Sequence, residues 1–227
     1  MDEKIHSEYF NRKSEEYDDY IKLLPAYEKI IEEIQELAEP KSTHTIMDIG
    51  IGTGLLSFEL AKKAKKIIGI DISEKMLERA EKNFREKGIE NIELKKMNCI
   101  DLKIEDSSMD TIISNLVIHH LDDKEKETAI KEMHRVLKNS GKIVIGDLIR
   151  TEKGIDEMTA NIVGTVRSKY GDSATIKILA QAMKKMFLVP EYPATEEFWK
   201  CALEKEGFKD ISIRQINGPL FIIYAEK

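Results

Sequence analysis

From Thr45 onward, short runs of apolar, mostly β-branched residues alternate with longer stretches in which apolar residues recur at helical spacing. This alternation predicts strands that are joined by helical crossovers, and therefore a mainly parallel sheet with both faces covered. The expected strands are 45–49, 66–70, 92–97, 111–114, 142–145, 211–216 and 220–225. The expected helices between them are 55–65, 73–87, 124–137 and 195–207.

The last two expected strands are separated by little more than Asn217, Gly218 and Pro219. Such a gap fits a hairpin and is too short for a crossover, so one terminal strand should run antiparallel to the others. The expected fold class is therefore α/β, a doubly wound and mostly parallel seven-stranded sheet with an antiparallel C-terminal strand.

Two segments lie outside this alternation. Between Glu8 and Leu37, apolar and aromatic residues recur at helical spacing and predict two helices within residues 1–40. The segment 150–194 follows the fifth expected strand, beside the edge at which parallel sheets bind ligands. We expect residues 1–40 and 150–194 to form a lid over a core of residues 41–149 and 195–227. A helical hairpin that only packs is the alternative for 150–194.

Composition narrows the class of protein. The 227 residues are 41% hydrophobic and 34% charged, which suits one ordinary folded domain. No stretch approaches the roughly 20 apolar residues of a membrane span, and the start MDEKIHSEYF lacks the pattern of a signal peptide, so we expect a cytoplasmic protein without a membrane partner. The net charge of -6 disfavours nucleic acid as a partner. Cys99 and Cys201 lie far apart, so neither a disulfide framework nor a metal site is expected.

A glycine-rich stretch, DIGIGTGLL, follows the first expected strand and contains Gly50, Gly52 and Gly54. Glycine lets the backbone approach a ligand closely, and the N-terminus of the next helix favours a negatively charged group. Asp71 ends the second expected strand, where a carboxylate can accept hydrogen bonds from two ribose hydroxyls. The turn, the preceding Asp48 and Asp71 together predict a nucleoside-containing ligand. A nicotinamide dinucleotide is disfavoured, because its fingerprint needs glycine where this chain has Leu55.

Four stretches resemble the class I S-adenosylmethionine-dependent methyltransferases. They are MDIGIGTGLLSFEL, IIGIDISEKMLERA, NCIDLKIEDSSMDTIISNLVIHHL and EMHRVLKNSGKIVIGD, which follow one another in family order. The resemblance implies a Rossmann-like methyltransferase fold and S-adenosylmethionine as the cofactor. It also implies the following contacts: Asp48, Gly50 and Gly52 with the methionine moiety, Asp71 with the ribose, Ile72 and Met76 with the faces of the adenine, Asn98 and Cys99 with its edge, and Asn115 with the reacting sulfonium. The family usually has an acid near the adenine amino group, and the carbonyl of Asn98 can accept the same hydrogen bond without a charge.

His119 and His120 lie just past the fourth expected strand, near the implied position of the methyl group. One of them could take the proton from a hydroxyl or ammonium acceptor, and a packing role is the alternative. Tyr9, Tyr17 and Tyr20 could close over the cofactor from the N-terminal helices, with ordinary packing as the alternative. Cys201, on the last helix, is expected in the core.

The N-terminal stretch YFNRKSEEYDDYIKLLPAYEKI resembles the carboxy-S-adenosylmethionine synthases, in which a tyrosine reaches the cofactor. The resemblance assigns that role to Tyr27. Those synthases hold the extra carboxylate with an arginine on the last helix, and the equivalent residue here is Ala202. Without that cation, ordinary S-adenosylmethionine is the expected ligand.

These observations predict a methyltransferase that transfers a methyl group to a small-molecule acceptor by direct in-line displacement. Two alternatives stay open: an enzyme that uses carboxy-S-adenosylmethionine in tRNA modification, and a non-catalytic protein that binds S-adenosylmethionine. The sequence identifies neither the acceptor nor the oligomeric state.

Overall fold

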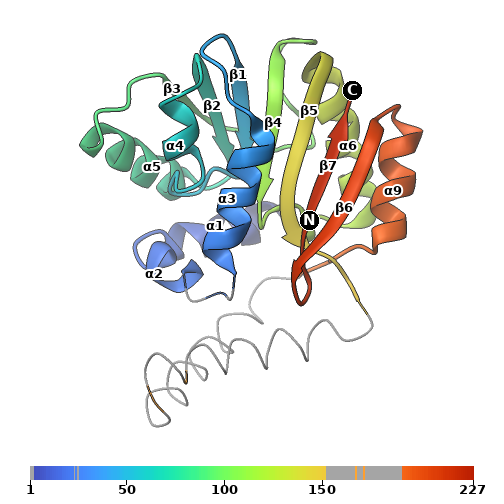
Figure 1. Cartoon of the computed structure of the whole chain (residues 1–227). Helices are drawn as coiled ribbons and strands as arrows, with labels where there is room; N and C mark the ends of the chain where they lie inside the picture. The colour runs from blue at the N-terminus through green and yellow to red at the C-terminus, as the bar shows by residue number, and fades with distance from the viewer. Residues whose placement is uncertain (1–2, 23, 25, 152–166, 168–170, 172–190) are drawn as a thin grey trace.

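The structure is a computed structural model that describes residues 3–22, 24, 26–151, 167, 171 and 191–227. Within these residues, seven strands form one sheet in the order β3-β2-β1-β4-β5-β7-β6 (Figure 1). The strands are β1 (Thr45–Ile49), β2 (Lys66–Asp71), β3 (Ile92–Lys96), β4 (Met109–Asn115), β5 (Leu137–Leu148), β6 (Lys209–Asn217) and β7 (Leu220–Glu226). Strands β1 to β5 pair in parallel, and β7 lies antiparallel between β5 and β6. The expected fold class, including its antiparallel C-terminal strand, is confirmed.

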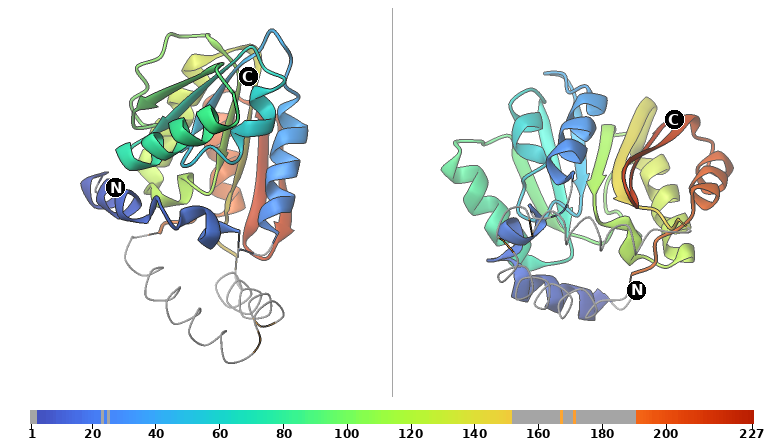
Figure 2. Two further views of the ribbon diagram at one scale, coloured as in Figure 1. Left: turned by 90° about the vertical axis from the view of Figure 1, so that its left-hand side faces the viewer. Right: turned by 60° about the horizontal axis from the view of Figure 1, so that its bottom comes forward.

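Alternating side chains along the strands point to opposite faces of the sheet, as the pleat requires. Ile46 and Val144 face one core cluster, whereas Met47 and Ile143 face the other. Helices α3 (Tyr27–Ala38), α4 (Ser57–Ala61) and α5 (Glu74–Glu86) contribute to the first cluster, and α6 (Asp123–Val136) and α9 (Glu196–Lys205) contribute to the second (Figure 2). The central strands β1, β4 and β5 are therefore buried on both faces of the sheet, and their carboxyl ends remain open to a ligand.

The N-terminal segment forms three helices where two were expected. Helix α1 (Glu3–Lys13) is followed by a short helix, α2 (Tyr17–Ile21), before α3. Helix α3 packs on the sheet, where Ile30 and Ile34 are fully buried. Helices α1 and α2 instead lie at the lower edge of the sheet in Figure 1, where the parallel strands end. Among the described N-terminal helices, α1 and α2 are therefore placed for a lid role and α3 is not; the lid role itself stays a prediction.

Several boundaries differ from those expected. Helix α4 covers 57–61 instead of 55–65, because the N–H groups of Lys65 and Lys66 both donate to the carbonyl of His44, which draws the chain into β2. Helix α5 begins as expected after Ser73, whose side chain accepts from the N–H of Met76. Most of the expected lid segment 150–194 lies outside the described residues. In the described part of the chain, no helix is both long and apolar enough to cross a membrane.

Candidate active site

A cavity opens at the carboxyl ends of β1, β2 and β4, and it encloses about 630 Å³ of empty space when its open mouth is counted. Its walls come from the glycine turn, the end of β2, the loops after β3 and β4, and helices α1 and α2. The residues that line the cavity include His6, Phe10, Tyr17, Gly50, Gly52, Asp71, Ile72, Met76, Asn98, Cys99, Val117 and His120. Parallel sheets bind ligands at this edge, so the cavity is the candidate site.

The glycine turn is held tightly against the loop after β4. Gly50 has a φ of +68°, and a Cβ built on it would lie 2.3 Å from Cγ2 of Val117. Gly52 has a φ of +55°, and its N–H donates to Oδ2 of Asp71 over 3.0 Å. A larger residue at Gly50 would therefore meet both backbone strain and a steric clash.

Asp71 ends β2 with its carboxylate at the cavity wall. Its Oδ2 accepts from Gly52 N–H, and its Oδ1 accepts from the N–H of Ser73 over 2.8 Å. Burial raises the pKa of Asp71 to about 6, although these two N–H donors favour the charged form. Asp71 is therefore mainly ionised at neutral pH, and it can accept hydrogen bonds from a ligand.

Asp48 is not a lining residue of this cavity. It is 1% exposed beneath the turn, where the hydroxyl of Ser57 donates to its Oδ2 over 2.6 Å. Burial raises the pKa of Asp48 to about 7, and repulsion from Asp71 adds to the effect. Of the three residues predicted at the methionine moiety, the structure brings Gly50 and Gly52 to the cavity and leaves Asp48 behind them.

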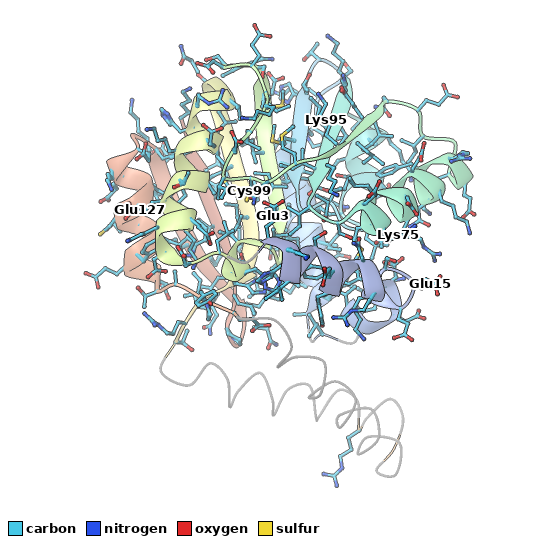
Figure 3. All side chains as sticks on the ribbon, turned by 180° about the vertical axis from the view of Figure 1, so that it is seen from behind. Glu3, Glu15, Lys75, Lys95, Cys99 and Glu127 are labelled. Atoms are coloured by element: carbon cyan, nitrogen blue, oxygen red, sulfur yellow. The ribbon has the colours of Figure 1, made fainter. Side chains whose placement is uncertain are left out.

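The four residues predicted at the adenine all line the cavity: Ile72, Met76, Asn98 and Cys99. Burial raises the pKa of Cys99 to about 12, so its thiol stays protonated and acts as a small apolar surface. Asn98 donates from Nδ2 to Glu3 of α1 over 2.8 Å, and its Oδ1 accepts from the N–H of Ile100. Figure 3 labels Glu3 and Cys99 at the centre of the view, where α1 crosses this loop.

Helix α1 is docked on the adenine side by polar residues spaced four apart. Besides Glu3, Ser7 donates to the carbonyl of Ile72 over 3.1 Å, and Oδ1 of Asn11 accepts from the hydroxyl of Ser73 over 2.8 Å. This docking brings His6 and Phe10 into the cavity wall, and Tyr17 of α2 joins them. Sequence reasoning missed His6 and Phe10, although their spacing of four residues places them on one helix face.

The two candidate histidines have different surroundings. His120 lines the cavity, and its ring packs against Phe10 and His6 with centroid distances of 5.4 and 5.5 Å. His119 is 5% exposed and lies outside the lining, with Nδ1 2.5 Å from Oδ1 of Asp147. Burial alone would lower the pKa of His119, but the charge and hydrogen bond of Asp147 outweigh it, and the pKa is raised.

Three further residues lie away from the cavity lining. Tyr27, the first residue of α3, is buried in the core, where burial raises its pKa, and Asn115 ends β4 without reaching the lining. The expectation that Cys201 is a core residue is wrong, because α9 buries Trp199, Ala202 and Leu203 and leaves Cys201 exposed. Ala202 thus packs in the core instead of facing the site.

Among the described residues, no three His, Cys, Asp or Glu side chains are grouped to hold a metal.

Comparison with known proteins identifies the family. Residues 46–141 match a family model described as a methyltransferase domain. Over 208 residues the chain is 33% identical to an uncharacterized methyltransferase of Oceanobacillus iheyensis, covering 92% of this chain and 87% of that one. The chain belongs to the class I S-adenosylmethionine-dependent methyltransferases. S-adenosylmethionine is accordingly the cofactor of this methyltransferase.

Solved structures of other methyltransferases have the same fold. A putative S-adenosylmethionine-dependent methyltransferase from Methanococcus maripaludis has a TM-score of 0.66 and 26% identity, with 96% of this chain and 94% of that one covered. For an S-adenosylmethionine-dependent methyltransferase from Aquifex aeolicus the TM-score is 0.64 at 20% identity, with 95% and 97% covered. The methyltransferase described here shares their fold, whereas the N-terminal resemblance to carboxy-S-adenosylmethionine synthases stays a prediction.

The cavity of this methyltransferase fits its cofactor chemically. A nucleoside needs an acceptor for its ribose hydroxyls and an apolar slot for its base, and an amino-acid moiety needs close backbone approach. Asp71 offers the acceptor, the side chains of Ile72 and Met76 offer the slot, and the turn at Gly50 has no side chain to obstruct the approach.

Proposed function

We propose that this methyltransferase transfers a methyl group to a small-molecule acceptor by direct in-line displacement. One observation carries the proposal: Asp71 and His120 line the same cavity, and α1 lies over it. The cofactor carries its methyl group on a positively charged sulfur, which makes the sulfur a good leaving group. The protein's own work is therefore to bind, to align and to exclude water.

In the proposed site, Asp71 accepts hydrogen bonds from the ribose, and Gly52 N–H keeps its carboxylate oriented. Ile72 and Met76 flank the adenine, and Asn98 and Cys99 lie at its edge. The backbone at Gly50 and Gly52 faces the methionine moiety. Contacts of the cofactor with Asp48, Tyr27 and Asn115 stay predictions. These three residues lie outside the cavity lining, which counts against such contacts.

The acceptor is proposed to be small because helix α1 covers the cavity. Helix α1 is fixed to the rim by Glu3, Ser7 and Asn11, and its residues His6 and Phe10 form part of the wall. An acceptor has to fit beneath this helix or displace it. A small molecule meets that condition more readily than a folded macromolecule.

The proposal is tested with cofactor that carries a radiolabelled methyl group. The protein is incubated with a bacterial extract that ultrafiltration has divided into a small-molecule fraction and a macromolecular fraction. We expect label to enter the small-molecule fraction with the parent protein and to be strongly reduced with Asp71→Asn. Label that enters only the macromolecular fraction would overturn the assignment of a small acceptor, and no transfer to either would favour a binding protein.

The alternative with a carboxylated cofactor has its own measurement. The cofactor that copurifies with the protein is released, and its mass is measured by mass spectrometry. The mass distinguishes the two cofactors, because only carboxy-S-adenosylmethionine has the extra carboxylate. We expect S-adenosylmethionine or its demethylated product. Ala202 supports this expectation, because it stands where the synthases have their arginine. Its side chain is uncharged and buried in the core, so it cannot pair with an extra carboxylate.

A further inference from the structure

The turn that carries His120 is held from two sides by buried charged side chains. It comprises the 3-10 helix η1 (Ile118–His120) and Leu121, and it follows directly on β4. Asp147 approaches it from the end of β5 and is 1% exposed, and Lys126 approaches it from α6 and is fully buried. Charged side chains are rarely buried this deeply without a specific set of partners.

Asp147 binds both the backbone and the ring of His119. Its Oδ2 accepts from the N–H of His119 over 3.0 Å, and its Oδ1 lies 2.5 Å from Nδ1 of that residue. Oδ1 also accepts from the N–H of Leu148 over 2.7 Å. One carboxylate thus fixes the position of residue 119 and the orientation of its ring.

Lys126 holds the other side of the turn. Its ammonium group donates to the carbonyl of Leu121 over 2.6 Å, to the carbonyl of Tyr192, and to Asp123 over 3.3 Å. The N–H of Tyr192 in turn donates to the carbonyl of His119 over 2.6 Å. Residues 119 and 121 are therefore both anchored, and the residue between them is His120.

The side chain of His120 is held by rings as well as by its backbone. The ring of His119 lies behind it with a centroid distance of 4.0 Å, and Phe10 and His6 of α1 lie 5.4 and 5.5 Å away. With its backbone anchored and its ring packed on three sides, His120 has little freedom to turn away from the cavity. This arrangement suits a group that must meet a reacting atom in a fixed geometry.

Buried charged side chains that only stabilised the fold could often be replaced by apolar side chains of similar volume. Here the buried charges of Asp147 and Lys126 satisfy backbone groups on both sides of one cavity residue. We propose that His120 is the catalytic residue that accepts the acceptor's proton, and that Asp147 and Lys126 are positioning residues that hold it there. The inference rests on the proposed function.

The proposed step balances as follows. The lone pair of the acceptor atom forms the bond to the methyl carbon, and the carbon–sulfur bond breaks with its electron pair retained on sulfur, which becomes neutral. His120 takes the proton that the acceptor must lose and then releases it to solvent; an ammonium group gives up this proton before the attack, because only then is its lone pair free. The acceptor class that needs such a residue is a hydroxyl or an ammonium group.

The test needs no knowledge of the acceptor. Sinefungin has an ammonium group where the cofactor has its methyl group, and S-adenosylhomocysteine lacks both. We expect His120→Phe, which keeps the ring packing, to weaken sinefungin by about tenfold, the value of one hydrogen bond, and to leave S-adenosylhomocysteine nearly unchanged. Calorimetry on the full chain measures both affinities.

The positioning residues are tested by the ratio of the affinities for sinefungin and S-adenosylhomocysteine. A substitution that only disturbs the fold would leave this ratio unchanged. We expect Asp147→Asn and Lys126→Met to lower sinefungin binding severalfold relative to S-adenosylhomocysteine, and Asp147→Glu to recover part of the loss. Asp110→Asn is the control, because Asp110 accepts from Thr45 N–H and pairs with Lys138 at the opposite edge of the sheet. Thermal unfolding shows which variants are folded.

The outcomes separate the two proposals. If His120→Phe binds both ligands in the same ratio as the parent, His120 does not face the reacting position and the inference is overturned. If Asp147→Asn weakens both ligands equally, its role is structural and the positioning claim fails. A parent protein that binds neither ligand overturns the proposed function itself, and this inference with it.

Discussion

Gly50 and Val117 are in direct contact across the floor of the cavity: a Cβ built on Gly50 would lie 2.3 Å from Cγ2 of Val117. The contact couples the turn after β1 to the loop after β4, which carries His120. A methyl group at position 50 would push these two loops apart. The position of the turn after β1 therefore depends on the position of the loop after β4.

Gly50→Ala should accordingly lose cofactor binding. We expect its affinity for S-adenosylhomocysteine to fall by at least about tenfold, because the clash moves the cavity wall. Gly88→Ala is the matched control, since Gly88 has a φ of +66° with open space where its Cβ would lie. Both variants should lose about 1–2 kcal/mol of stability from the left-handed backbone, but only Gly50→Ala should lose affinity in calorimetry. Equal affinities would contradict the proposed position of the ligand.

Cofactor binding should depend on the ionisation of Asp71. Its pKa is raised to about 6, so the affinity for S-adenosylhomocysteine should fall as the pH drops through that value, because the protonated acid is the weaker acceptor. Asp71→Asn should lower the affinity by roughly 10–100-fold and flatten the pH profile. Asp101 is an exposed acid in the loop after β3, and Asp101→Asn should leave the affinity and its pH profile unchanged. An unchanged profile in Asp71→Asn would place the ribose elsewhere.

Asp48 should destabilise the fold at alkaline pH. Its ordinary pKa is 3.8 and its folded pKa is about 7, so stability is highest below the first value and falls as the pH rises between the two. Asp48→Asn removes this loss, and Ser57 can still donate to the amide oxygen. We expect its unfolding temperature to exceed the parent's at alkaline pH, by about 2–4 °C for each kcal/mol of ionisation penalty that the substitution removes, with a smaller difference in acid. A gain that is independent of pH would contradict the explanation.

The docking of α1 should control the escape of the cofactor. Asn11→Ala removes the acceptor for the Ser73 hydroxyl and the Lys75 N–H, so α1 should exchange its amide hydrogens faster. Dissociation of S-adenosylhomocysteine should become severalfold faster as well. Glu8→Ala, on the exposed side of the same helix, serves as the control. If dissociation from Asn11→Ala is as slow as from the parent, α1 does not gate the cavity.

The two cysteines should react very differently with iodoacetamide. Cys201 is exposed on α9, whereas Cys99 is buried and its pKa is raised to about 12, which leaves almost no thiolate. At neutral pH we expect alkylation at Cys201 alone, with cofactor binding unaffected. Peptide mass spectrometry measures the modification at each site. Rapid labelling of Cys99 would show that the cavity opens more widely than the structure indicates.

Much of the fold and the adenosine end of the site could be predicted from the sequence, because their signals are local. The glycine turn and Asp71 lie within about two dozen residues of each other, and strand pairing brings them together as the alternation predicts. The missed residues depend on tertiary docking. His6 and Phe10 reach the cavity because Ser7 and Asn11 bind Ile72 and Ser73 in the turn between β2 and α5, and no local pattern encodes such partners.

The difference between His119 and His120 is also a tertiary property. Adjacent in sequence, they are equivalent until Asp147 selects one as its partner. The same holds for helix ends, since the chain after α4 is drawn into β2 by the carbonyl of His44, which accepts from the N–H groups of Lys65 and Lys66. Helical periodicity could predict that a helix exists here, but not where a distant carbonyl would end it.

Strand β6 adjoins the sheet through β7 alone, since β7 lies between it and β5. During folding, β6 can therefore find its place only after or together with β7, so the hairpin should add to the growing sheet as one unit. Its nine-residue span, Lys209–Asn217, would be among the last backbone segments to gain protection and among the first to lose it. The end of the sheet farthest from β3 should therefore be protected last in a hydrogen-exchange experiment on the refolding chain.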